Sequence, residues 1–241
     1  MSQGQPIRDV RASDGVRVAV AVLLLARMAA GAAPGRSDLT GTIRLALPGG
    51  ATSPGADSVV WVAGAHRSAV RSSAQPPAVA SRDKRFDPHV LVVTRGSTVS
   101  FPNVDPIYHN AFSRTPGSEF DLGLYRRGAA RAFTFRSAGL VHLYCNIHAE
   151  MAAYVLVLDP EDAFAVADGG GSFRLADLPA GRQAVHVWSE KGGEKELTVD
   201  VGAEGAAPLE VVLDASSYRP MPHKNKFGQD YPPATQGVDR Y

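Results

Sequence analysis

The chain has 241 residues, which is enough for one large domain or two small ones. Apolar residues make up 44% of it and charged residues 20%, as in ordinary globular proteins. The formal net charge of +1 gives no long-range attraction to nucleic acid, and the single cysteine excludes an internal disulfide.

The first 32 residues predict a secretory signal peptide. Basic residues come first, an apolar run follows over residues 16–26, and a small-residue stretch favours cleavage after Ala32. The run is shorter than the about 20 residues that a spanning helix needs. We therefore expect a periplasmic protein without stable membrane insertion after signal removal, with an uncleaved membrane anchor as the alternative.

Residues 34–66 predict two strands. Ile43, Leu45 and Leu47 alternate with more polar positions, and residues 58–63 are rich in strand formers. The two strands are separated by a loop rich in Pro, Gly and Ser. Residues 66–77 predict a linker or loop.

Residues 78–158 predict a series of short strands and no helix. Two of the strands flank Gly96 and are expected to form a hairpin around a glycine turn. Short strands separated by turn signals favour an all-β fold of the sandwich type. The predicted strands cover residues 78–81, 86–94, 97–101, 131–135, 140–145 and 154–158.

A thiolate, an imidazole and a thioether occur together in residues 145–151, as Cys145, His148 and Met151. A soft thiolate with imidazole suits copper, and a long axial thioether commonly completes a blue-copper site. A second imidazole is still needed, and His109 is the candidate. The alternatives are Glu150 as a hard ligand in place of Met151, and a thiol nucleophile that uses His109 or His148 as its base.

Four further histidines are left out of the predicted site. His142 points away from Cys145 by strand alternation, and the others have no evident partner. They are His66, His89, His142 and His186.

The order His109-Asn110 followed by Cys145-x-x-His148-x-x-Met151 resembles the cupredoxins, and its spacing is similar to the short ligand loop of amicyanin. The resemblance implies a Greek-key β-sandwich over residues 78–158. It also implies one type 1 copper held by His109, Cys145, His148 and an axial Met151.

The same resemblance implies supporting roles around the copper. Asn110 would brace the ligand loop, and its backbone N–H would approach the thiolate. Electrons would pass through the exposed edge of His148. The apolar patch around that edge would consist of Ile147, Ala149, Ala152 and Ala153.

Residues 159–214 resemble the later half of a carboxypeptidase regulatory-like β-sandwich, on the basis of Phe173-x-Leu175 and Leu178-Pro179-x-Gly181. Residues 34–66 would supply its earlier half, so the cupredoxin would be inserted into it. The alternative is that residues 38–64 add edge strands to the cupredoxin. Residues 215–241 predict a docked or flexible tail, in which His223 is expected to be solvated.

The combination resembles proteins labelled methylamine-utilisation proteins. It implies an exported electron carrier rather than an enzyme, with a c-type cytochrome or periplasmic dehydrogenase as the redox partner. Two other functions remain open. One is copper storage, sensing or delivery, and the other is a structural role for a fold that binds no metal.

Overall fold

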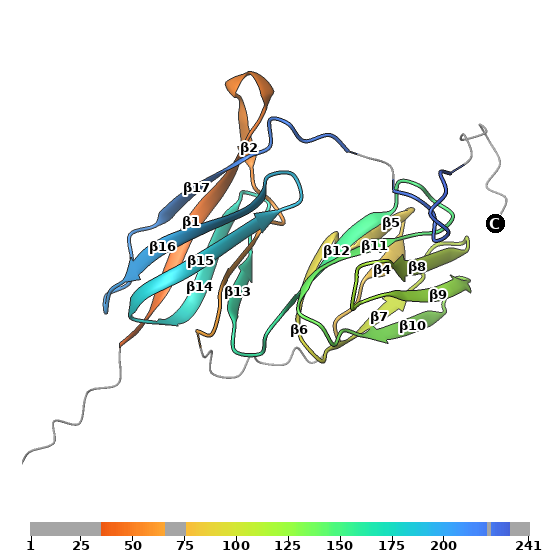
Figure 1. Ribbon diagram of the computed structural model, residues 1–241, viewed down its shortest axis with the longest axis horizontal. Helices are drawn as coiled ribbons and strands as arrows, with labels where there is room; N and C mark the ends of the chain where they lie inside the picture. Colours follow the sequence, from red (N-terminus) through yellow and green to blue (C-terminus); the bar gives the residue numbers. More distant parts are fainter. Residues whose placement is uncertain (1–34, 66–75, 221–222, 232–241) are drawn as a thin grey trace, which may run out of the picture. The chain divides into compact units, whose positions relative to one another are not determined.

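A computed structural model describes residues 35–65, 76–220 and 223–231. The expected signal peptide and most of the predicted linker, with His66, lie outside these residues. The described residues form β-strands arranged as two sandwiches, so the all-β prediction is confirmed (Figure 1). Their one helical element is a 3-10 turn, η1 (Pro48–Gly50), and no described helix has the length and apolarity to cross a membrane.

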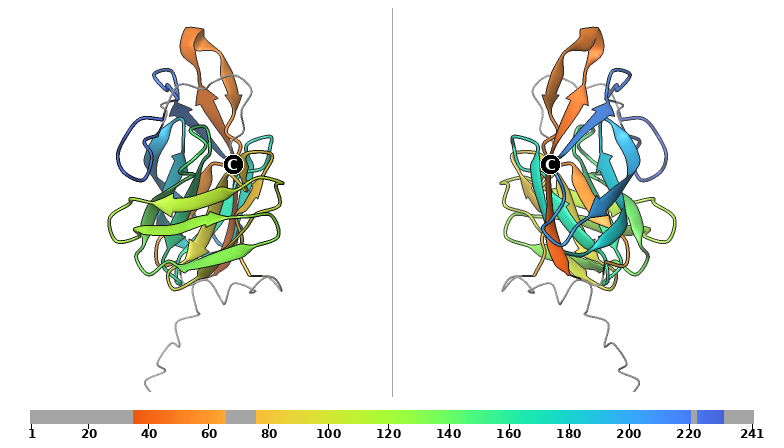
Figure 2. Two further views of the ribbon diagram at one scale, coloured as in Figure 1. Left: turned by 90° about the vertical axis from the view of Figure 1, so that its right-hand side faces the viewer. Right: turned by 90° about the vertical axis from the view of Figure 1, so that its left-hand side faces the viewer.

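The first sandwich, here the companion sandwich, combines strands from both ends of the described chain. One sheet has the order β14-β1-β17 with β2 added to β1, and the other has the order β13-β3-β15-β16. The first and last strands lie side by side and run parallel (Figure 2). The strands are β1 (Arg36–Ala46), β2 (Thr52–Pro54), β3 (Val59–Val62), β13 (Ala163–Val166), β14 (Ser172–Pro179), β15 (Gly181–Ser189), β16 (Gly193–Val201) and β17 (Leu209–Asp214).

Alternation of apolar side chains explains how this sandwich closes. In β1, Leu39, Ile43 and Leu45 point inward and are buried. In β17, Val211 and Leu213 do the same on the neighbouring strand. These side chains belong to one hydrophobic core, which also contains buried residues of β3, β14 and β15.

The second sandwich, here the site sandwich, lies between β3 and β13 in the sequence. Its larger sheet has the order β6-β12-β11-β8-β9, and β7 pairs with β10 in the other sheet. The strands are β4 (Ala80–Arg82), β5 (Arg85–Asp87), β6 (Val90–Thr94), β7 (Thr98–Pro102), β8 (His109–Ser113), β9 (Phe120–Tyr125), β10 (Ala130–Thr134), β11 (Gly139–Tyr144) and β12 (Ala152–Leu158).

The predicted hairpin around Gly96 is wrong. Strand β6 pairs in parallel with β12, whereas β7 pairs antiparallel with β10. The turn at Gly96, with φ +92°, therefore carries the chain from one sheet to the other instead of joining two paired strands. The Gly96 N–H donates to the Phe135 carbonyl at 2.7 Å, which fixes the crossing.

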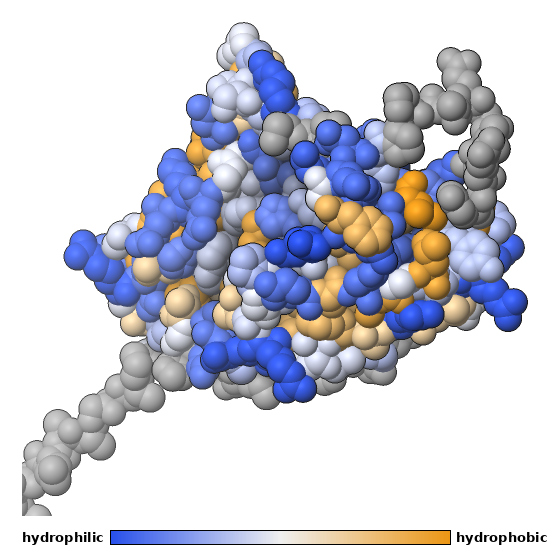
Figure 3. Space-filling model, turned by 45° about the vertical axis from the view of Figure 1, so that its right-hand side comes forward, coloured by the Kyte–Doolittle hydropathy of each residue, from blue (hydrophilic) through white to orange (hydrophobic). Residues whose placement is uncertain are grey.

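A third hydrophobic cluster joins the two sandwiches. Val59 and Trp188 come from the companion sandwich, and Val90, Leu156 and Leu158 come from the site sandwich. Trp188 is 7% exposed, and its ring lies 5.2 Å from that of Tyr154. On the face drawn in Figure 3, hydrophobic residues form small groups separated by hydrophilic ones.

Candidate metal centre

Three of the four predicted ligands come together at one end of β8 and β11. One ligand atom from each of His109, Cys145 and His148 lies within 4.8 Å of the others. Cys145 Sγ is 3.6 Å from His148 Nδ1, and the two imidazole centroids are 4.8 Å apart. Within the described part of the chain, no other group of three or more His, Cys, Asp or Glu side chains meets this spacing.

Local sequence explains why these residues meet. The alternation of β11 buries Val141, Leu143 and then Cys145, which directly follows the strand. Strand β8 lies beside β11 in the sheet and begins with His109. The sheet therefore brings together two ligands that are far apart in sequence.

The loop from Cys145 to Met151 is closed by its own backbone. The Cys145 N–H donates to the Met151 carbonyl at 3.1 Å, and the Met151 N–H donates to the His148 carbonyl at 3.1 Å. Met151 is 0% exposed and belongs to the same hydrophobic cluster as Cys145. Glu150 is exposed. Of the two residues predicted as alternatives for the axial position, Met151 is therefore the one buried in the cluster that contains the thiol.

The orientation of His109 is fixed by a residue that sequence reasoning missed. His109 is fully buried, and its Nε2 lies 2.8 Å from Oδ2 of Asp105. Its Nδ1 is also buried but has no hydrogen-bond partner. A buried nitrogen left unsatisfied costs about 1–3 kcal/mol. Nδ1 is therefore the atom that a metal ion would satisfy.

Asp105 is itself held in place by backbone donors. The N–H groups of Asp83 and Lys84 donate to its carboxylate at 2.7 and 2.9 Å. Burial alone would raise the pKa of Asp105, but these two donors and His109 together hold that pKa below its usual value. The available sequence signal was the position of Asp105, four residues before His109 and two after Asn103. In the structure the Asn103 side chain accepts the Asp105 N–H at 3.0 Å.

The thiol of Cys145 lies in a buried environment. Burial raises the pKa of the thiol, and the backbone N–H groups of Ile147, Asn110 and His148 offset only part of that rise. A bound metal cation favours the thiolate outright. Burial therefore favours the neutral thiol, and a cation bound beside the sulfur would favour the thiolate.

The predicted brace by Asn110 is confirmed. Its Oδ1 accepts the N–H of Asn146 at 3.2 Å, and its Nδ2 donates to Asp121 Oδ1 at 2.7 Å. The backbone N–H of Asn110 also reaches the Cys145 sulfur. Asn110 therefore connects the segment that carries His109 to the loop that carries Cys145.

The predicted apolar patch needs one correction. Ile147, Ala149 and Ala152 are partly exposed, as is His148. Ala153 is only 1% exposed and packs in the core, because its position in β12 points inward. It is therefore not part of the surface around His148.

The described histidines that were left out of the site lie outside this cluster. The expectation that His89 and His186 have no partner is wrong. His89 Nε2 lies 2.7 Å from Glu190, and His186 stacks on Trp61 with centroids 5.0 Å apart. His142 Nδ1 lies 3.1 Å from the Tyr144 hydroxyl. His223 was expected to be solvated but stacks on Tyr144 at 4.3 Å.

No protein-family model and no curated protein matches the chain. A purple cupredoxin from Nitrosopumilus maritimus is similar in structure, with 20% identity, 34% of this chain and 98% of that chain covered, and a TM-score of 0.31. A reduced amicyanin variant has 19% identity, covers 42% of this chain and 98% of its own, and has a TM-score of 0.33.

A copper-containing nitrite reductase (NirK) from Thermus scotoductus SA-01 is also similar. It has 25% identity and a TM-score of 0.34, and the match covers 39% of this chain and 26% of that chain. These similarities concern only part of the chain, and at such TM-scores they do not by themselves assign a function.

Proposed function

We propose that residues 78–158 are a cupredoxin domain that binds one copper ion and carries single electrons. The observation that supports this most strongly is the set of His109, Cys145 and His148 with ligand atoms within 4.8 Å, in which His109 Nδ1 is buried and unpartnered. A thiolate with two imidazoles is a donor set that suits copper.

In this proposal each residue has a separate role. His109 and His148 supply neutral imidazole nitrogens, Cys145 supplies the thiolate, and Met151 supplies a weak thioether contact. Bound copper would provide a one-electron couple between Cu(I) and Cu(II). The closed loop and the Asp105 bond hold the protein ligands in place, so they need not rearrange when the charge of the centre changes.

Electron exchange would take place at the partly exposed His148, beside Ile147, Ala149 and Ala152. A small apolar surface of this kind suits a short-lived contact with another redox protein. We propose a c-type cytochrome or a periplasmic dehydrogenase as that partner, reached after export through the predicted signal peptide. The companion sandwich would be a regulatory-like module with residues 34–66 and 159–214 as its two parts.

The chief alternative is copper storage or delivery. The burial of His109, Cys145 and Met151 favours the carrier, because a delivery site has to release its ion readily to an acceptor. The two functions are distinguished by repeated reduction with ascorbate and oxidation with ferricyanide, followed by measurement of bound copper. A carrier keeps one copper per chain through many cycles, whereas loss of the ion on reduction would support delivery.

A further inference from the structure

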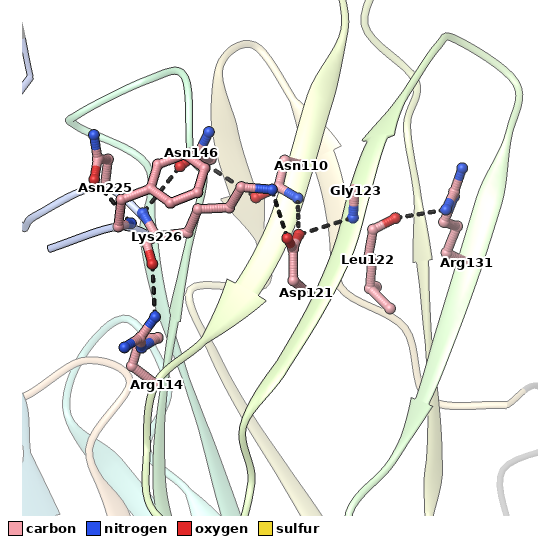
Figure 4. A network of polar contacts seen from close by, with 10 residues as sticks. Asn110, Arg114, Asp121, Leu122, Gly123, Arg131, Asn146, Asn225 and Lys226 are labelled. Carbon is pink, nitrogen blue, oxygen red and sulfur yellow. Dashed lines mark hydrogen bonds and ion pairs between the residues drawn. The ribbon is translucent and has the colours of Figure 1, made fainter.

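The C-terminal segment of residues 223–231 contacts the metal centre at several points. Lys226, near the middle of this segment, closes a ring of hydrogen bonds around the segments that carry His109 and Cys145 (Figure 4). The Lys226 N–H donates to Asn146 Oδ1 at 2.9 Å, and its Nζ donates to Asp121 Oδ2 at 2.6 Å. Asn110 completes the ring, because it bonds both Asn146 and Asp121.

The ring joins the two residues that directly follow proposed ligands. Asn110 follows His109, and Asn146 follows Cys145. Lys226 is also held through its carbonyl, which accepts a hydrogen bond from Arg114 Nη1 at 2.6 Å. The backbone and side chain of one tail residue therefore bond to three separate places on the site sandwich.

The tail presents Lys226 in a turn that is organised by its own side chains. Asn225 Oδ1 accepts the N–H groups of Phe227 and Gln229 at 2.9 and 3.0 Å. The backbone of Asn225 also bonds to Gly228 and Gln229, and Gly228 has φ +79°, which glycine adopts readily. Because the turn is ordered locally, less conformational entropy is lost when it docks.

Aromatic residues hold both ends of the segment. His223 stacks on Tyr144, the residue directly before Cys145, with an interplanar angle of 22°. The Tyr231 hydroxyl donates to the backbone carbonyl of Cys145 at 2.6 Å. The segment therefore bonds or stacks on Tyr144, Cys145 and Asn146 in succession.

We infer that residues 223–231 are a positioning element of the metal centre, in which Lys226 locks the two ligand-bearing segments together and limits access to Cys145. This inference deepens the proposed copper function. Removal of the Lys226 ammonium opens the ring at Asp121 and loosens the docked turn. Cys145 then becomes reachable more often, although the sandwich itself stays folded.

The test uses the metal-free, full-length protein and the rate at which its one thiol reacts with Ellman's reagent. Lys226→Gln should raise that rate about 2- to 5-fold, the change expected for loss of one partly exposed ion pair. The matched control is Lys224→Gln, which removes the same charge two residues away. Lys224 pairs only loosely with the exposed Asp230, at 3.5 Å, so its replacement should leave the rate unchanged.

Tyr231→Phe is the second test variant, because it removes only the hydroxyl that bonds to the Cys145 carbonyl. It should also speed the thiol reaction. Hydrogen–deuterium exchange distinguishes local loosening from general destabilisation. Both variants should speed exchange in residues 109–110 and 145–151 and leave β15 and β16 of the companion sandwich unchanged.

Equal thiol rates for Lys226→Gln, Lys224→Gln and the unaltered protein would overturn the inference. So would faster exchange throughout both sandwiches in Lys226→Gln, since that would show a general role in stability. The readouts need no metal. A protein that shows the expected rates but binds no copper would contradict the proposed function and leave the positioning role in place.

Discussion

Oδ2 of Asp105 lies 2.8 Å from Nε2 of His109, and the opposite ring nitrogen of His109 is buried without a partner. The carboxylate thus determines which nitrogen of the ring faces the cluster. Such contacts to a ligand histidine commonly set both its orientation and its basicity.

Asp105→Asn should weaken copper binding about 10- to 100-fold. The amide keeps the size of the carboxylate but replaces one acceptor oxygen with a donor. Because three donors converge on this side chain, at least one of them would lose its acceptor. We also expect a loss of about 1–3 kcal/mol in the free energy of unfolding. Chelator competition and urea unfolding measure the two effects. The control is Asp87→Asn, which alters an exposed carboxylate in the same part of the chain and should change neither.

Met151→Leu should keep copper bound and raise the reduction potential. Leucine has a similar volume and fits a fully buried position at a cost below about 1.5 kcal/mol. It removes the thioether, whose weak donation favours the oxidised ion. Voltammetry of the loaded variant measures the change. An unaltered potential would count against Met151 as the axial ligand.

Stability should depend on pH through His89 and Glu190, which join the two sandwiches at 2.7 Å. The hydrogen bond to Glu190 raises the pKa of His89 above 6.5, and the same bond lowers the pKa of Glu190 below 4.5. The His89 contribution is complete below pH 6.5 and is lost as pH rises through the raised value. The Glu190 contribution is complete above pH 4.5 and is lost as pH falls through the lowered value.

The pair therefore stabilises the protein most between pH 4.5 and 6.5. His89 is 39% exposed, so we expect only about 0.5–1 kcal/mol to be lost as the pH is raised to about 8.5. Urea unfolding over this range is the measurement. Glu190→Gln should flatten the profile, whereas Glu194→Gln, at a more exposed carboxylate, should preserve it. Identical profiles for all three proteins would exclude the pair as the cause.

Trp188→Ala should cost about 3–5 kcal/mol in the free energy of unfolding. The indole is 7% exposed and packs in the cluster that joins the sandwiches, so its removal leaves a cavity there. Val212→Thr, on an exposed position of β17, should stay within about 0.5 kcal/mol. Calorimetry of both variants compares them, and a small effect at Trp188 would show that the cluster adds little stability.

Sequence reasoning located strands such as β1 and β11, in which apolar and polar residues alternate. The alternation arises because only one face of each strand is buried. It missed β8, where all five residues are buried and polar side chains occur among them, so that no alternation is visible. It paired β6 with β7 because a glycine turn is a local signal, whereas sheet membership depends on distant strands.

In the candidate site, too, local features could be predicted from the sequence, whereas features that depend on distant residues could not. The spacing of Cys145, His148 and Met151 is local, and the pairing with His109 came from a family resemblance. The Asp105 contact and the ring closed by Lys226 depend on backbone positions that only the fold determines. Asn225 and Gly228 are residue types that are common in turns, but residue type does not indicate where a turn docks.

The most direct test of the proposed copper centre is the visible absorption spectrum of the purified protein after addition of Cu(II), with Cys145→Ala as the control. We predict an intense thiolate-to-copper band, absent from the control and bleached by ascorbate, at one copper per chain. A colourless protein without stoichiometric copper would contradict the proposed copper centre.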